Sequence, residues 1–161
     1  MYTTLLHKPR HSGRFASLMD LYEQNYMLMR LLAPELKSMG HGSFLSQVPG
    51  AMVLELGELE HSRYTSTFRL TYRFPDNSLR GRSEREPDLA IRLYHDARTC
   101  EVMSGLMPEG RIEIRRRRDL EEGRRLNRFL QKWLSYCLRQ GHQFGEHSAS
   151  IEVPADYCEQ Y

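Results

Sequence analysis

Residues 89–102 read LAIRLYHDARTCEV, and this stretch decides the fold that the sequence predicts. Apolar and polar side chains alternate on both sides of a short polar segment from His95 to Arg98, as they do in two antiparallel strands joined by a turn. The alternation makes one face of the hairpin apolar and the other polar, which is typical of an antiparallel sheet covered on one side. The stretch therefore predicts the central hairpin of a sheet with one buried face.

Four further segments predict strands of the same sheet. The clearest runs from Arg63 to Phe74, where six apolar or small residues alternate with Arg and Thr. The loop expected at 75–88 contains Pro, Gly and mixed charges. The other three strand segments are 44–48, 52–60 and 111–117, and turn residues (Pro49, Gly50, Pro108, Gly110) precede the last two.

Two amphipathic segments predict helices, one before and one after the strands. Ser17 is expected to cap the first, whose apolar residues recur at three- and four-residue steps as far as Leu32. The second follows the cap residue Asp119, carries a wide apolar stripe around Trp133, and ends at Gly141. The expected fold class is α+β, an antiparallel sheet of about five to six strands packed against an N-terminal and a C-terminal helix.

The length of 161 residues predicts one domain. We expect a flexible leader at 1–14, a single α+β domain at 15–141 and an acidic flexible tail at 142–161. The sequence contains no apolar stretch of the length that a signal peptide or a membrane span requires. Its three cysteines show no CxxC spacing, which favours reduced thiols, and together these features predict a cytoplasmic location.

His95 and Asp96 are the one candidate pair for acid–base chemistry, with Arg98 or Glu101 as groups that would hold an anion. Adjacent residues on an extended chain point to opposite faces, so the carboxylate does not orient the imidazole unless the turn folds them together. No nucleophile motif and no phosphate-binding glycine loop accompanies them. The sequence therefore favours a turn aspartate and a half-buried histidine bonded to backbone, and it predicts no catalytic residue, metal or cofactor.

Arginines dominate the polar face of the predicted sheet. Because guanidinium groups bind carboxylates and phosphates in a fork geometry, this face is the candidate partner-binding surface of a non-enzymatic binding or adaptor protein with a protein partner. RNA binding is an alternative, although a single aromatic residue is fewer than RNA platforms use for stacking. A small enzyme acting at the His95 turn is a third. The candidate binding residues are Arg63, Arg69, Arg73, Arg92, Tyr94, Arg115 and Arg117.

These charges have an alternative interpretation within the chain itself. Residues 111–139 carry ten basic and four acidic side chains, a local net charge of +6, whereas residues 140–161 carry a net charge of −4. The arginines are then either a contact surface or a solvated face across which the acidic tail lies. The sequence leaves both possibilities open.

Four segments, in this order, resemble the DUF1249 family, small proteins of gammaproteobacteria without an assigned activity. They are EQNYMLMRLLAP at 23–34, RYTSTFRL at 63–70, IRLYHDARTCEV at 91–102 and LNRFLQKWLSYCLRQGH at 126–142. The segment RLYHDA is the most specific of these marks. The resemblance covers most of 17–142, but between Glu113 and Arg125 this chain has IRRRRDLEEGRR in place of a longer family pattern. If the family's function depends on that stretch, this member has lost or altered it.

Overall fold

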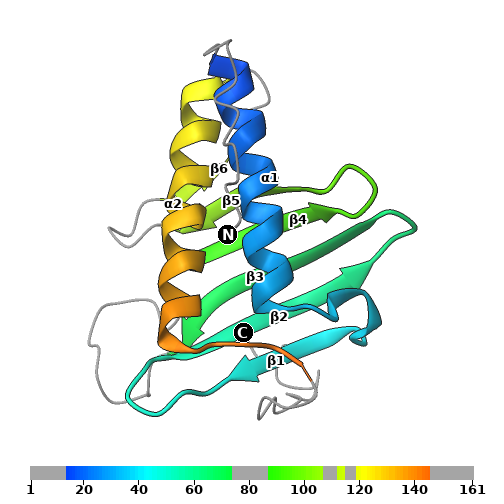
Figure 1. Cartoon of the computed structure of the whole chain (residues 1–161), viewed down its shortest axis with the longest axis vertical. Coiled ribbons are helices and arrows are strands. Elements are labelled where there is room, and N and C mark those ends of the chain that lie inside the picture. The colour runs from blue at the N-terminus through cyan, green and yellow to red at the C-terminus, as the bar shows by residue number, and fades with distance from the viewer. Residues whose placement is uncertain (1–13, 74–86, 107–111, 115–118, 146–161) are drawn as a thin grey trace, which may run out of the picture.

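The computed structural model describes residues 14–73, 87–106, 112–114 and 119–145, with side chains for 17–73, 87–106 and 119–145. Within these ranges the chain forms two long helices, a short 3-10 helix and six strands (Figure 1). Their bounds are α1 (Arg14–Leu32), η1 (Leu36–Ser38), β1 (Gly42–Ser46), β2 (Val53–His61), β3 (Thr65–Arg73), β4 (Asp88–Tyr94), β5 (Thr99–Leu106), β6 (Ile112–Ile114) and α2 (Leu120–Gln140).

The six strands form one sheet in chain order, and every neighbouring pair is antiparallel. Both long helices lie side by side over the same face of this sheet and run in the same direction (Figure 1). They can run parallel because the whole sheet separates them in sequence. The predicted α+β fold class, with its two terminal helices, is confirmed.

The 89–102 hairpin forms as predicted, with β4 and β5 joined by a turn at residues 95–98. Leu89, Ile91 and Leu93 are buried on the helix-facing side of β4, while the residues between them are partly exposed. Arg98 closes the turn with a φ of 54°, a left-handed conformation that is uncommon for a residue with a side chain.

The predicted alternation of β3 is confirmed, since Ser66, Phe68, Leu70 and Tyr72 are all buried. In β2 the alternation changes phase at a bulge after Gly57, where Glu58 has a φ of 53°. A bulge adds one residue to its strand, so the inward positions move from Leu54 and Leu56 to Leu59 and His61. The sequence pattern alone did not predict this shift.

The second helix begins and ends where its capping residues predict. The Glu122 backbone N–H donates to Asp119 Oδ1 at 3.0 Å, and Gly141 ends the helix in the left-handed conformation at a φ of 95°. The first helix differs, because α1 begins at Arg14 and Ser17 lies inside it rather than at its cap. Side-chain capping preferences are local, and helix packing extends the element beyond them.

The packed domain continues beyond the boundary expected at residue 141. His142 is 2% exposed and Phe144 is completely buried, and the Phe144 backbone N–H donates to the Leu32 carbonyl at 2.8 Å. These residues were expected in the solvated tail because few apolar neighbours surround them in sequence. A single large aromatic ring is enough to hold the chain against the core. The expected leader, the 75–86 part of the loop and the remainder of the tail lie outside the described residues.

Asn127 links three elements at the centre of the helix layer. Its Oδ1 accepts the Val102 backbone N–H of β5 at 3.1 Å, and its Nδ2 donates to the Gly123 carbonyl at 2.7 Å. Its own carbonyl accepts from Asn25 Nδ2 of α1 at 3.0 Å. Both asparagines are completely buried, so these hydrogen bonds replace those that water would make.

Asn127→Ala is expected to lower the free energy of unfolding by about 1–3 kcal/mol, because it leaves the buried Val102 N–H without its acceptor. Chemical denaturation measures this loss. Gln131→Ala is the control one helical turn further along, where the lost hydrogen bond to Gln24 is solvent-exposed. Equal stability losses in the two variants would show that the buried amide has no special role.

Trp133→Ala tests the centre of the core. Trp133 is 5% exposed and packs edge-on against Tyr72, with ring centroids 5.4 Å apart. Removing this ring is expected to cost about 3–5 kcal/mol of unfolding free energy. Tyr136→Ala, which removes a ring that is 48% exposed on the same helix, should cost far less. Unchanged melting temperatures for both would contradict the packing of α2 on the sheet.

Candidate functional site

The outer face of the sheet, opposite the helices, carries Arg69, Arg73 and Arg92 of the predicted binding surface, whereas Arg63, predicted to lie in a strand, is in the turn between β2 and β3. Arg69 on β3 forms a two-pronged ion pair with Asp88 on β4, with Nε–Oδ1 at 3.0 Å and a terminal nitrogen to Oδ2 at 2.8 Å. This pairing raises the pKa of Arg69. A carboxylate of the same chain therefore already occupies the fork that was expected to meet a partner.

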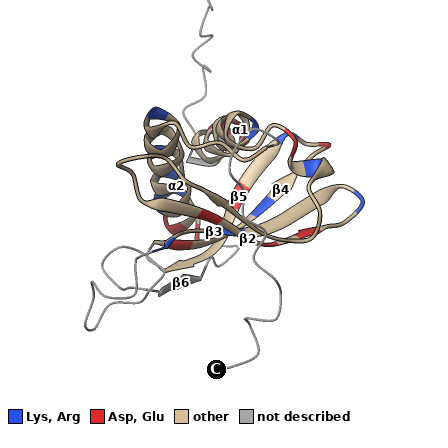
Figure 2. Ribbon diagram, turned by 90° about the horizontal axis from the view of Figure 1, so that it is seen from below, with Lys and Arg blue, Asp and Glu red and all other residues tan. Residues whose placement is uncertain are grey.

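Arg73 is engaged in a similar way, with its Nε 2.5 Å from Oε2 of Glu55 on β2. Glu55 is only 4% exposed, so the two residues form a partly buried ion pair. A cavity of about 20 Å³ next to Glu55 is lined mainly by polar residues and has room for roughly one water molecule. Basic and acidic positions are interspersed on the strands (Figure 2).

The remaining predicted binding residues differ in their surroundings. The Tyr94 hydroxyl donates to Glu101 Oε1 at 2.8 Å, and Arg92 lies opposite Glu101 in the β4–β5 register. Arg63 is exposed and stacks over the Tyr64 ring, 5.1 Å from its centroid. Arg115 and Arg117 lie outside the described residues. The described part of this face is thus more nearly charge-balanced than a count of its arginines indicates.

His95 points to the helix side of the sheet and joins a partly buried hydrogen-bond chain. Its Nε2 is 2.7 Å from Ser66 Oγ, and Ser66 Oγ is 2.7 Å from His61 Nδ1. His61 Nε2 lies 2.8 Å from the Met39 carbonyl. Because a carbonyl only accepts, the neutral His61 carries its proton on Nε2, so Ser66 donates to His61 and accepts from His95.

Ser66 and its two histidines are the residue types of a catalytic serine–histidine dyad, but the serine hydroxyl is not accessible to a substrate. Ser66 is 0% exposed and sits between two imidazoles, so no substrate carbonyl can approach its Oγ. Asp96 and Arg98, the other candidates at this turn, are exposed, and the His95 imidazole hydrogen-bonds to Ser66. The arrangement serves to hold the β2–β3 and β4–β5 ends together, and the predicted half-buried histidine is found, bonded to a serine hydroxyl as well as through its backbone.

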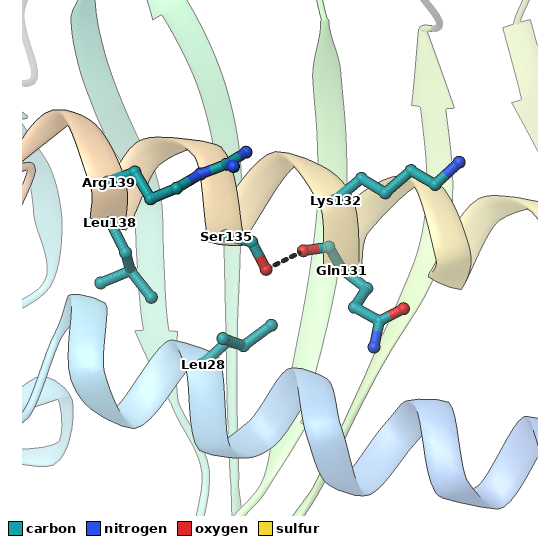
Figure 3. Close-up of a pocket in the computed structure, with 6 residues that line it drawn as sticks. All are labelled: Leu28, Gln131, Lys132, Ser135, Leu138 and Arg139. Carbon is teal, nitrogen blue, oxygen red and sulfur yellow. Dashed lines mark hydrogen bonds between the residues drawn. The ribbon is translucent and has the colours of Figure 1, made fainter.

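The helix layer contains a groove of about 440 Å³ along the seam between α1 and α2. Figure 3 shows Leu28 and Leu138 entering the seam from the two helices, with Lys132 and Arg139 extending from α2. Ser135 donates to the Gln131 carbonyl at 2.8 Å and gives the floor a polar segment. The lining residues are Leu28, Gln131, Lys132, Ser135, Leu138 and Arg139.

The cations at this groove differ from those on the sheet. Lys132 and Arg139 are exposed, and neither forms an ion pair with any other residue whose side chain the structure describes. Arg128, one turn before Lys132, is exposed in the same way. The sequence shows the local excess of basic residues in 111–139. It does not show that Lys132 and Arg139 lie beside an apolar seam, because their position depends on how the two helices pack.

The two helices that form the groove carry further exposed apolar side chains outside its lining. Met27 and Leu31 of α1 are 62% and 61% exposed, and Tyr136 of α2 is 48% exposed. Large apolar side chains that stay exposed beside a groove are typical of contact surfaces. Met27 and Met29 are two residues apart in sequence but differ in environment, since Met27 is exposed and Met29 is buried in the core.

Among residues with described side chains, no group of three or more His, Cys, Asp and Glu lies close enough to hold a metal ion. No described helix combines the length and the apolar content needed to cross a membrane.

The chain matches the model of a known protein family. The model of the family described as "Protein of unknown function (DUF1249)" matches residues 27–143. The chain belongs to the DUF1249 family. The match confirms the resemblance that the RLYHDA segment indicates, and it includes the hairpin, both flanking strands and α2.

Relatives named "Uncharacterized protein YqiB" come from Escherichia coli strains K12 and O157:H7. Each is 30% identical to this DUF1249 member over 142 residues, covering 82% of this chain and 94% of its own length. No solved structure matches the chain significantly.

Acidification is expected to destabilise this protein through two histidines. Burial lowers the pKa of His95, and the positive charges of Lys37 and Arg30 act in the same direction, opposed by Asp96. Burial also lowers the pKa of His142. Below about pH 6.5 the unfolded chain takes up protons that the folded chain does not, so the free energy of unfolding falls as the pH is lowered.

Denaturation curves at pH 7.5 and 5.5 measure this slope, which is at most about 1.4 kcal/mol per pH unit for each histidine. His95→Gln retains an N–H that can donate to Ser66 and should reduce the pH dependence. A slope that His95→Gln leaves unaltered would show that His95 titrates normally in the folded state.

Proposed function

We propose that this DUF1249 member is a non-enzymatic binding protein whose partner is a protein segment with acidic and apolar side chains. The observation that carries the proposal is the groove between α1 and α2, where Lys132 and Arg139 lie along one edge beside apolar side chains and have no ion pair among the described side chains. Lys132 and Arg139 supply charge for carboxylates, and Leu28 and Leu138 supply apolar contact. An apolar centre with charged side chains at its edge is typical of grooves that bind peptide segments.

The predicted sheet surface is the weaker candidate for this role. A partner that binds there must displace Asp88 from Arg69 or Glu55 from Arg73, and Glu55 would then be left as a nearly buried, uncompensated charge. Leaving such a charge unpaired costs several kcal/mol. At the helix groove, a partner carboxylate does not have to displace a carboxylate of any described residue from Lys132 or Arg139.

Nucleic-acid binding is the alternative that the basic residues keep open. Single-stranded RNA platforms combine cations with exposed aromatic rings on which bases stack. The groove lining contains no aromatic side chain, and Tyr136 is the one exposed ring near it on α2. The composition of the groove therefore supports a protein segment better than RNA.

The test is capture of binding partners on immobilised full-length protein from an Escherichia coli lysate, with and without nuclease, followed by titration of the purified partner. Lys132→Glu with Arg139→Glu is expected to weaken binding at least tenfold, because it replaces attraction by repulsion at both rim positions. Melting temperatures confirm that the variant is folded.

The matched control reverses two charges of the predicted sheet surface, Arg63→Glu with Arg92→Glu, and should leave the affinity within about twofold. If this variant loses the partner and the groove variant retains it, the outer sheet face is the binding surface. Recovery that disappears with nuclease identifies RNA as the ligand and overturns the protein-binding proposal.

A further inference from the structure

We propose that the groove between α1 and α2 is also the docking site of this chain's own acidic segment, residues 146–161, which competes there with the partner. This inference rests on the proposed function, since it concerns regulation of the same groove. Three observations support it: the place where the described chain ends, the reach of the segment, and the match of its charges and apolar residues to the groove.

The described chain ends at the correct end of the helix layer. After Gly141 the backbone passes the C-terminal ends of both helices, and Phe144 hydrogen-bonds to the Leu32 carbonyl at 2.8 Å. Leu138 and Arg139, which line one end of the groove, belong to the last turn of α2. Residue 146 therefore follows an anchor at the C-terminal end of α1, where Leu32 lies one helical turn beyond Leu28 of the groove lining (Figure 1).

The segment has the reach to lie along the whole groove. The groove residues of α2 extend from Gln131 to Arg139, about 12 Å along a helix axis. Residues 146–161 are 16 residues long and span up to about 50 Å when extended. Half of that length is enough to return from Phe144 to the seam and cover it.

The charges of the segment complement those of the groove. It contains four acidic residues and no Lys or Arg, whereas Lys132 and Arg139 face solvent without an ion pair among the described side chains. The two cations are seven residues apart on α2, about 10 Å along the axis. Glu152 and Asp156 are four residues apart, about 13 Å in an extended chain, so each reaches one cation within the length of a side chain.

The apolar residues of the segment match the floor of the groove. Ile151 and Val153 alternate with Glu152, so an extended backbone directs them to the side opposite that carboxylate. Pro154 favours an extended conformation for the residue before it. Ile151 and Val153 can then contact Leu28 and Leu138 while the acidic side chains turn to the rim.

Disulfide trapping in the full-length protein tests this docking without any partner. Cys158 provides a thiol within the segment. With Glu152 beside Arg139 and Asp156 beside Lys132, Cys158 lies about 7 Å beyond Lys132 toward the start of α2, so Gln131→Cys provides the second thiol at that end of the groove. Cys100 and Cys137 are buried and their thiol pKa values are raised, so they react slowly. In a glutathione redox buffer we expect an intramolecular disulfide between residues 131 and 158, identified by mass spectrometry.

The matched control is Thr67→Cys, a partly buried position on the outer face of the sheet. The disulfide from Gln131→Cys should form at least tenfold faster than that from Thr67→Cys. This advantage should largely disappear in 1 M salt or in the Lys132→Glu/Arg139→Glu background, because both remove the attraction. Equal rates at the two positions, or a rate difference unaffected by salt and charge reversal, would overturn the proposal.

A second measurement avoids any change on the groove floor. A nitroxide attached to Cys158 of the otherwise native chain should broaden amide signals of Leu28, Gln131 and Ser135 in NMR spectra, and leave those around Thr67 sharp. Broadening distributed evenly over both faces of the molecule would contradict docking in the groove.

Competition gives the last readout. Glu152→Gln with Asp156→Asn is expected to increase the affinity for the captured partner about threefold or more, because the groove becomes vacant more often. Trapping that succeeds without any captured partner supports docking of the segment and rejects the proposed partner. A partner that binds the groove with an affinity unaffected by these substitutions supports the proposed function and rejects competition.

Discussion

The hydrogen bonds of Asn127 join the layers of this protein in a way that apolar packing alone does not provide. One buried side chain accepts from the sheet at Val102 and donates to its own helix at Gly123, and its backbone receives Asn25 from the other helix. The pairing of β5 with the described residues of β6 covers Ser104 to Leu106, and beyond it the Val102 N–H hydrogen-bonds to this amide. A buried amide that satisfies an edge N–H fixes both the position and the rotation of α2 over the sheet.

That fixed rotation determines which residues of α2 remain in solvent. With Leu126, Leu130, Trp133, Leu134 and Cys137 directed into the core, the basic side chains at 128, 132 and 139 face outward. On the opposite side of the molecule, cross-strand register brings Arg69 to Asp88 and Arg73 to Glu55. The two faces therefore differ mainly in their ion pairs. Arg69 and Arg73 on the sheet already have carboxylate partners, whereas Lys132 and Arg139 on α2 have none among the described side chains.

The parts of the fold that local sequence patterns describe could be predicted. Period-two alternation in β3 and in the β4–β5 hairpin, the 3.6-residue stripe of α2, and its caps at Asp119 and Gly141 all depend on neighbours within a few residues. The bulge at Glu58, the early start of α1 and the burial of Phe144 depend on distant contacts, and the local patterns did not reveal them. The candidate site was likewise predicted only in part. The strand alternation predicted that Arg69, Arg73 and Arg92 share one face of the sheet, but the ion-pair partners of Arg69 and Arg73 depend on the strand register. The groove depends on the packing of two helices about a hundred residues apart in the chain.

The parallel pairing of α1 and α2 has a consequence for how the chain acquires its structure during synthesis. Asn25 and the carbonyl that it meets on Asn127 are separated by 102 residues, so the apolar face of the first helix has no helical neighbour until nearly all of the chain has been made. At about 5–20 residues per second, that interval lasts roughly 5–20 s. Contacts between the two ends of a chain also slow folding, because the closure of a long loop must precede the energy gained from it. The buried face of α1, which is the most protected surface of the finished protein, is therefore the surface that is exposed longest in the nascent one.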